Sequence, residues 1–213
     1  MSSGARVDRW RWLNDWRLFW LLSLADTVAV GCGLPWVDYR SAKGLEFMIK
    51  HSVRCSLPLF LMAFTASPLA RIRRSDFSRW LVRNRRYIGL AFAYAMFIHF
   101  AWVGYSTYHF GNGLNRFVTS LDLIGALFLS AMTVTSSDFA IRLMGPSNWR
   151  RLHKAGIYAI WALFTYIYLS AVRYERELHD ILIAALLLIA WALRVFAKPA
   201  GRGPRVVGRT ASP

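Results

Sequence analysis

Apolar residues recur along this chain in six long runs, each bounded by polar or basic residues. The runs cover about residues 17–36, 47–67, 87–107, 117–137, 152–172 and 178–197. A membrane-spanning helix needs about 20 predominantly apolar residues, and each run reaches that length. The short connections leave little chain for a separate soluble domain. The pattern therefore predicts an all-α, polytopic membrane bundle of six transmembrane helices over residues 17–197.

Basic residues lie mainly between the apolar runs and indicate an orientation. The chain has 27 Lys and Arg against 11 Asp and Glu, a formal net charge of +16. Most of these cations fall in the amino-terminal tail, the second and fourth connections and the carboxyl-terminal end, and the positive-inside rule assigns these segments to the cytoplasm. Both termini are therefore expected to be cytoplasmic. Because topology accounts for the charge, no nucleic-acid partner is predicted.

The two ends of the chain differ in composition from the runs. Residues 1–16 hold three Trp among Arg residues, which is typical of an interfacial segment in contact with membrane lipid. Residues 198–213 are rich in Gly, Pro and Arg and are expected to form a disordered basic cytoplasmic tail. Cys32 and Cys55 both fall toward the outer face. A disulfide between them and two buried thiols both fit the sequence, and buried thiols are favoured.

The stretch from Arg85 to His99 is apolar or aromatic between its polar ends. As a helix rising about 1.5 Å per residue it covers roughly 21 Å, which separates an inner level at Arg85 from an outer level at His99. By the same rise, His153 is expected at the inner level and Tyr166 at the outer level. Imidazole at the iron and arginine near the propionates are how a helix bundle holds haem. A lone intramembrane histidine can equally form an ordinary hydrogen bond, so the pattern alone leaves both readings open.

Other polar residues within the runs are weaker candidates. Asp26 lies in the first run, where a hydrogen-bonded carboxyl group and a proton or quinol role are both open. Asp122 and Arg54 fall at similar depth and are expected to pair. His51 lies at the outer boundary, where an interfacial histidine is favoured over an axial ligand. The sequence has no Walker or Rossmann glycine pattern, so electrons would have to come from another protein or a small carrier.

Several short motifs occur in a characteristic order. They are Ser67-Pro68-Leu69-Ala70-Arg71, Arg85-Arg86-Tyr87-Ile88-Gly89-Leu90 leading to His99, Thr135-Ser136, and Trp149-Arg150-Arg151-Leu152-His153 followed by Tyr158. Their order and spacing over about residues 17–197 resemble the ferric-reductase-like transmembrane family. Within it, they resemble the haem-binding membrane subunits of bacterial periplasmic methionine-sulfoxide reductase systems.

This resemblance implies a multi-pass protein of the bacterial inner membrane that binds one or two haem b groups. It would pass electrons from a cytoplasmic flavin reductase or quinol to a periplasmic redox partner, and a flavin is implied by the resemblance alone. It implies His99 and His153 as ligands of haem iron, and Arg85 as a residue that holds a propionate or faces the inner iron. The family's second histidine on the fifth helix falls at Tyr166, which is either a phenolate ligand or a packing residue.

The tyrosine at this position also leaves a second function open. A family member with lost or reduced haem binding would serve as an accessory or scaffold subunit of a larger membrane complex. Bound haem in the purified protein distinguishes the electron-transfer subunit from this alternative.

Overall fold

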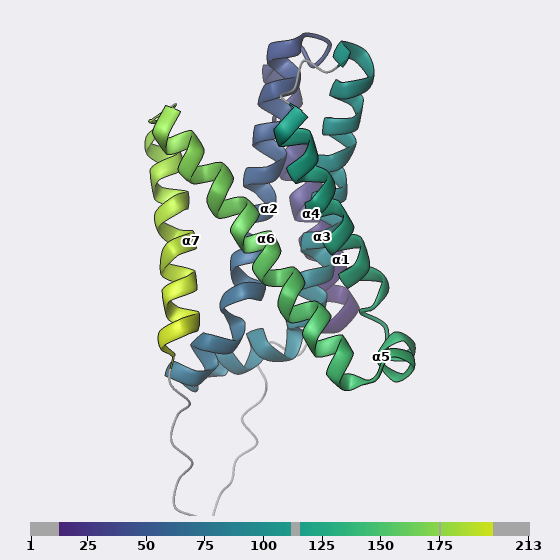
Figure 1. Ribbon diagram of the computed structural model, residues 1–213, viewed down its shortest axis with the longest axis vertical. Helices are drawn as coiled ribbons and strands as arrows, with labels where there is room; N and C mark the ends of the chain where they lie inside the picture. The colour runs from purple at the N-terminus through teal and green to yellow at the C-terminus, as the bar shows by residue number, and fades with distance from the viewer. Residues whose placement is uncertain (1–12, 112–115, 175, 198–213) are drawn as a thin grey trace, which may run out of the picture.

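The computed structural model describes residues 13–111, 116–174 and 176–197. Within these ranges every regular element is helical (Figure 1). The elements are α1 (Asp15–Gly31), the short 3-10 helix η1 (Leu34–Trp36), α2 (Ala42–Ile72), α3 (Asp76–Phe110), α4 (Arg116–Val134), α5 (Asp138–Met144), α6 (Pro146–Tyr174) and α7 (Leu178–Phe196). Five helices are long and apolar enough to cross a membrane, or six if α4 and α5 count as one bent span. The predicted all-α bundle is confirmed for these ranges, with five or six candidate spans against the six predicted. The terminal tail over residues 198–213 and most of the segment 1–16 lie outside the described ranges.

The helices depart from the predicted runs mainly at the basic end of the molecule. α3 begins well before residue 87 because Ser75 and Ser78 form a reciprocal cap, each hydroxyl accepting from the other's backbone N–H at 3.1 and 3.0 Å. The predicted straight run 117–137 instead ends at Val134, and α5 turns by 98° from α4. Ser137 caps α5 by accepting from the backbone N–H of Ala140 at 3.1 Å. Ser137, whose hydroxyl is also compatible with a continuous transmembrane helix, therefore begins a new helix after the end of α4.

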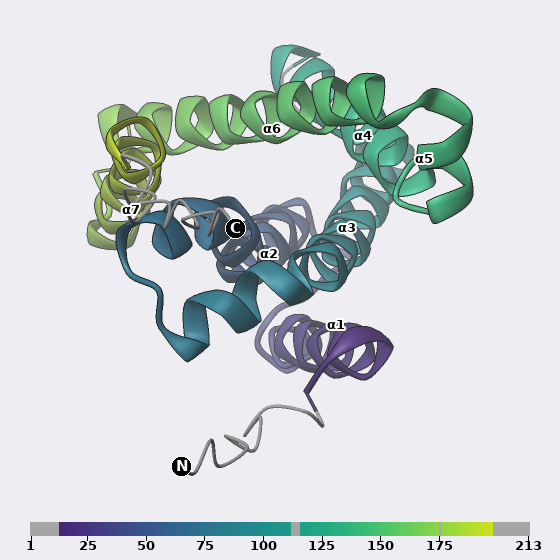
Figure 2. The ribbon, with the colours of Figure 1, turned by 90° about the horizontal axis from the view of Figure 1, so that it is seen from below.

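α2 and α3 pack along each other and form the centre of the bundle, with α1 against α3 (Figures 1 and 2). α6 packs chiefly against α4 and α7 rather than against this central pair. Aromatic side chains bridge the space between them; the ring centroids of Phe60 on α2 and Phe164 on α6 are 5.1 Å apart, and Phe92 of α3 contacts both rings. On both sides of these rings, space for side chains or ligands remains between α6 and the α2–α3 pair.

A proline in α2 fastens the inner end of α7. Pro68 has no N–H to donate to the carbonyl of Phe64, four residues earlier in the helix. Arg194 of α7 supplies the missing donor: its Nη1 lies 2.8 Å from the Phe64 carbonyl oxygen. The guanidinium carbon also lies 4.6 Å from the centroid of the Phe64 ring, within the range of a cation–π interaction. The hydrogen bond that Pro68 cannot form within α2 is thus replaced by one from Arg194 of α7.

An ion pair fastens the outer end of α7. Oδ1 of buried Asp180 lies 3.5 Å from Nη2 of Arg54 and 3.0 Å from Nε2 of His179, and Arg54 also contacts that His179 nitrogen. The expected pairing of Arg54 with Asp122 is therefore wrong. Asp122 and Asp180 both lie at a depth that Arg54 can reach. The packing of the helices, which depth alone does not determine, places Asp180 beside Arg54.

Candidate functional site

Two adjoining cavities occupy the space between α6 and the α2–α3 pair. The inner cavity, nearer α5, has a volume of about 820 Å³, and the outer cavity has a volume of about 550 Å³. Phe92, Leu129 and Ile160 line both and form the wall between them. Protein interiors are normally close-packed, and ligand pockets measure about 300–1,000 Å³. Both cavities therefore have the dimensions of ligand sites.

Two arginines from different helices project into the inner cavity and are held there by α2. Arg85 of α3 donates from Nε to the carbonyl of Ala63 at 3.1 Å and from Nη1 to the hydroxyl of Ser67 at 3.2 Å. Arg194 donates from Nε to the hydroxyl of Tyr158 at 3.2 Å, in addition to its bond with the proline-released carbonyl. A guanidinium has five N–H donors, and these bonds use two on each arginine. The remaining donors suit an anionic group inside the cavity.

His153 lies on the wall of the same cavity, in the third turn of α6. Its Nε2 is 3.1 Å from Oγ1 of Thr135, and that hydroxyl donates its own hydrogen to the carbonyl of Ala131 at 2.6 Å. The threonine oxygen therefore accepts, and Nε2 of His153 carries the hydrogen. Trp149 packs against the ring at a centroid distance of 4.3 Å and donates to the Thr135 carbonyl at 2.9 Å. Both contacts fix the orientation of the imidazole.

The mouth of the inner cavity is basic. No Asp or Glu is among the described residues that line this cavity. Asp138 of α5, just outside it, accepts from Nη1 of Arg86 at 2.9 Å. The exposed cations around the opening, named here the inner rim, are Arg71, Arg83, Arg86, Arg150 and Lys154.

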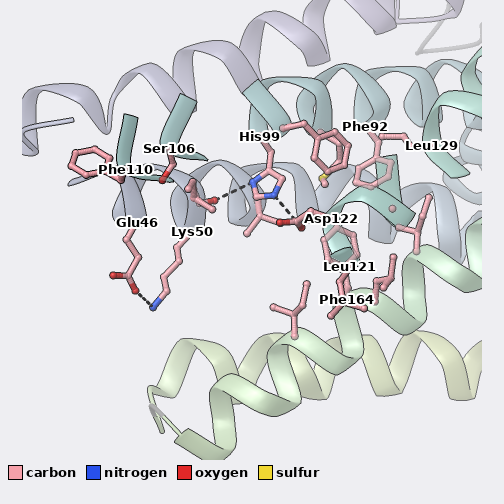
Figure 3. Close-up of a pocket in the computed structure, with 18 of the residues that line it drawn as sticks. Glu46, Lys50, Phe92, His99, Ser106, Phe110, Leu121, Asp122, Leu129 and Phe164 are labelled. Carbon is pink, nitrogen blue, oxygen red and sulfur yellow. Dashed lines mark hydrogen bonds and ion pairs between the residues drawn. The ribbon is translucent and has the colours of Figure 1, made fainter. Parts of the chain in front are cut away.

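The outer cavity contains a buried histidine with a different arrangement (Figure 3). Nδ1 of His99 lies 3.1 Å from Oγ of Ser52 and 3.2 Å from the carbonyl oxygen of Ile49. Because the Ser52 hydroxyl donates to that same carbonyl at 2.9 Å, both oxygens accept and Nδ1 carries the hydrogen. Nε2 faces the cavity, where Oδ1 of Asp122 lies 3.8 Å away. A hydrogen bond at Nδ1 is how proteins orient a histidine that binds a metal through Nε2.

The remainder of the outer cavity is largely apolar and aromatic, as Figure 3 shows. At its mouth Lys50 pairs with Glu46 at 3.1 Å, both on the first turns of α2. The lysine charge is thus offset locally.

Comparison with known proteins gives consistent relatives. A protein of Azospira oryzae named protein-methionine-sulfoxide reductase heme-binding subunit MsrQ is 30% identical over 190 residues, which cover 86% of this chain and 79% of that protein. The chain belongs to the MsrQ family. MsrQ of Caulobacter vibrioides is 31% identical over 163 residues, 72% of this chain and 76% of the relative. MsrQ of Yersinia enterocolitica is 32% identical over 169 residues, 75% and 79% of the two chains. No family model and no solved structure matches the chain.

Membership of the MsrQ family confirms the resemblance inferred from the motifs, and the relatives' name describes them as heme-binding subunits. The described residues contain no cluster of three His, Cys, Asp or Glu that could hold a metal ion. A metal at His99 or His153 would therefore need a group that brings most of its own ligands, as a porphyrin does.

The structure brings Arg85 and His153 together in one cavity, as predicted from their depth. It does not bring Tyr166 to His99. The Tyr166 side chain is 50% exposed and is absent from the lining of the outer cavity, whereas Ile167 lines it. An α-helix turns about 100° per residue, so the thirteen steps from His153 rotate position 166 by roughly 140° away from it, and the fourteenth step brings position 167 back to within about 40°.

The other candidates lie outside the two cavities. His51 donates from Nε2 to the carbonyl of Ala29 at 3.0 Å, which ties α2 to α1. Asp26 is buried in α1, and neither carboxylate oxygen has a hydrogen-bond partner among the described residues. Cys32 and Cys55 are both free thiols, as expected, but Cys32 is exposed and Cys55 is half-buried, so the expected burial is wrong.

Sequence reasoning missed one residue of the inner cavity, Arg194, and treated it only as a topological charge near the carboxyl terminus. A signal was present in α2. Pro68 within an apolar run leaves the carbonyl four residues earlier without a donor, and such a group in a membrane helix needs a partner from a neighbouring helix. Arg194 lies near the end of an otherwise aliphatic run and is one of few residues able to provide it.

Proposed function

We propose that this chain is a membrane haem b electron-transfer subunit that passes electrons across the bacterial inner membrane to a periplasmic acceptor such as a methionine-sulfoxide reductase. One observation carries the proposal: an 820 Å³ inner cavity combines an oriented imidazole, His153, with two anchored arginines and no acid among its described lining residues. The relatives, named as heme-binding subunits of a methionine-sulfoxide reductase, support the same cofactor and the same partner.

The residues of the inner cavity fit haem b in three respects. Apolar side chains, among them Phe60 and Phe92, offer flat surfaces to a porphyrin. Arg85 and Arg194 would pair with its two propionates, since guanidinium binds carboxylate through parallel hydrogen bonds. His153 would supply a nitrogen for the iron. Thr135 must release Nε2 before that nitrogen can bind, because the bond between them now uses it. When bound, haem iron accepts and donates one electron at a time.

At the outer level we propose His99 as a ligand. Its Nε2 faces the cavity, while Ser52 and the Ile49 carbonyl hold Nδ1. Tyr166 is not retained as its partner, because the side chain is half exposed and does not line the outer cavity. The inner cavity is therefore the primary haem site in this proposal. The outer cavity is secondary.

The direction of transfer follows from the proposed orientation. The inner cavity opens toward the basic end, which the positive-inside rule places in the cytoplasm. A cytoplasmic flavin reductase or membrane quinol would then donate electrons, and the acceptor would lie beyond the opposite end. An accessory role without haem is not favoured, because both the cavity chemistry and the relatives' name favour a haem.

The test is the absorption spectrum of the full chain purified in mild detergent from cells supplied with haem. We expect a Soret band and α and β bands that sharpen on dithionite reduction, with the haem per chain counted by pyridine haemochrome. A monodisperse, helical and colourless preparation would contradict the proposal and favour the accessory role. Reduction by a flavin reductase with reduced flavin, compared with reduction by a hydroquinone, then distinguishes the donors.

A further inference from the structure

Gly89 lines the inner cavity on the same face of α3 as Arg85. The two residues are four positions apart, which places Gly89 one helical turn from the anchored guanidinium. Phe92, on the next turn, forms part of the wall toward the outer cavity. A Cβ atom added to Gly89 would meet no other atom within 4 Å. The missing side chain therefore leaves space open on the wall that α6 faces (Figure 2).

Most other glycines of the described chain lie where the fold itself requires them. An added Cβ would come closer than 3.0 Å to another atom at Gly33, Gly44 and Gly156. Gly111 and Gly145 have φ angles of 65° and 78°, a backbone conformation that residues with a side chain rarely adopt. Close packing or backbone geometry thus explains these glycines without a ligand.

Neither reason applies to Gly89, which lies inside α3 without a positive φ. Gly within a helix is less stable than Ala, because it loses more conformational freedom on folding. Gly31 and Gly104 also have open space around them, but neither lines the inner or the outer cavity. Gly125 lines the outer cavity, where an added Cβ would lie 3.3 Å from Leu163. Among the described glycines, Gly89 alone combines open space with a place on the wall of one of these two cavities.

The surroundings of this open space indicate the chemistry of a ligand that would use it. Arg85 bounds it on one side with donors suited to a carboxylate, and Phe92 bounds it on the other with an aromatic ring. Between them, the backbone of α3 is bare at Gly89, and a glycine is the usual residue where a ligand approaches a backbone closely. A flat ring system that carries carboxylates fits all three features.

We propose that Gly89 determines which ligand the inner cavity accepts, because its missing side chain keeps open the space that a porphyrin ring occupies. This role rests on the proposed function, since haem is the porphyrin proposed there. It requires effects of opposite sign. A side chain at position 89 should leave the protein without ligand as stable as before or more stable, while it weakens porphyrin binding. A glycine needed for helix packing would lose stability instead.

The test uses the full chain, purified in mild detergent without haem, as Gly89→Ala and Gly89→Leu. Haem is titrated at the Soret band, and metal-free protoporphyrin IX is titrated by its fluorescence. Gly89→Leu should weaken both porphyrins by about tenfold or more, the usual effect of forcing extra methylenes into a filled space. Gly89→Ala should weaken them less. Without ligand, Gly89→Ala should raise Tm by about 1–4 °C.

Metal-free porphyrin separates space from ligation, because it keeps the ring and both propionates and has no iron. His153→Ala should therefore weaken haem more than metal-free porphyrin, whereas Gly89→Leu should weaken the two alike. The matched control is Gly104→Leu, on the same helix, with open space and outside both cavities. We expect its affinities for both porphyrins to stay within about twofold of the unaltered protein.

Three results would overturn the proposal. Equal affinities in Gly89→Leu and Gly104→Leu would overturn the role of Gly89 and leave the proposed function standing. A lower Tm in Gly89→Ala without ligand would show that the glycine serves helix packing. An unaltered chain that binds neither porphyrin would overturn the proposed function together with this role.

Discussion

The inner and outer cavities differ in which part of a ligand they are prepared to receive. In the outer cavity Nδ1 of His99 is hydrogen-bonded and Nε2 faces the open space, next to Asp122. In the inner cavity Nε2 of His153 is the bonded nitrogen. The cations favour the inner cavity instead. Two anchored arginines line the inner cavity, whereas the lysine at the mouth of the outer cavity is already paired with a glutamate. Orientation of an imidazole and provision for anionic groups are thus separable properties.

This difference shows why a histidine alone is a poor guide to a cofactor site. His99 is the more deeply buried and better oriented imidazole, yet a carboxylate is its nearest polar neighbour across the cavity. His153 requires a local rearrangement, yet its cavity would neutralise an anionic cofactor. In the proposed function, the balance between these two contributions would determine which cavity binds haem. The following predictions test the contrast between the cavities and the contacts that hold their residues.

The largest expected effect is loss of haem from His153→Ala. Removing a metal ligand should weaken binding by more than the roughly 10- to 100-fold that follows loss of a supporting group. His99→Ala should leave the inner haem in place, and His109→Ala, at an exposed position, is the control. Pyridine haemochrome on purified variants measures the result. If His99→Ala empties the protein and His153→Ala does not, the order of the two cavities is reversed.

The next effect concerns stability. Arg194→Leu should lower the free energy of unfolding by about 1–3 kcal/mol, because the Phe64 carbonyl loses its donor. In a Pro68→Ala background the restored N–H can bond to that carbonyl, so the same substitution should cost less. Reversible denaturation in mixed detergent micelles measures both. Equal losses in the two backgrounds would show that the proline has no part in the effect, and exposed Arg142→Leu should change stability by less than about 0.5 kcal/mol.

A smaller effect should have opposite signs in the two cavities. Thr135→Val frees Nε2 of His153 and should strengthen haem binding at the inner level by up to about tenfold, since a competing hydrogen bond is removed. Ser52→Ala removes one of two acceptors at Nδ1 of His99 and should weaken any binding at the outer level by about tenfold or less. Titration of haem into apoprotein, followed at the Soret band, gives both affinities. A change in the same direction for both would contradict the contrast drawn between the two histidines.

The smallest effect is expected at Tyr166. Tyr166→Phe should leave the ferric absorption spectrum and the haem content unchanged, because the side chain is half exposed and off the lining of the outer cavity. A tyrosinate ligand would instead produce a charge-transfer band that the variant loses. Such a loss would return Tyr166 to the site.

The sequence was sufficient for most of the long helices and for the depth of their polar residues. Runs of about 20 apolar residues predict spans, and helical rise places Arg85 and His153 at one level, where the structure also has them. Contact also depends on rotation about the helix axis, which depth does not include. Tyr166 has the expected depth and the wrong direction, although the same helical geometry contained that information.

The sequence did not determine which carboxylate pairs with Arg54. Arg54 had two carboxylates within its depth, and which one it meets depends on how α7 packs against α2. The bend between α4 and α5 was equally hidden, because Ser and Thr can bond to the preceding turn inside a straight helix or cap a new one. Three hydroxyls around residue 135 do the first, and Ser137 does the second.

The proline in α2 also bears on the order in which the chain is assembled. α2 is synthesised before α7, so the four helices α3 to α6 are made between the carbonyl of Phe64 and its donor Arg194. Until Arg194 arrives, the young protein contains a polar defect within the bilayer, where an unsatisfied carbonyl is costly. A chain that stops short of α7 keeps that defect. The carbonyl of Phe64 therefore gains this donor only once α7 has been inserted beside α2.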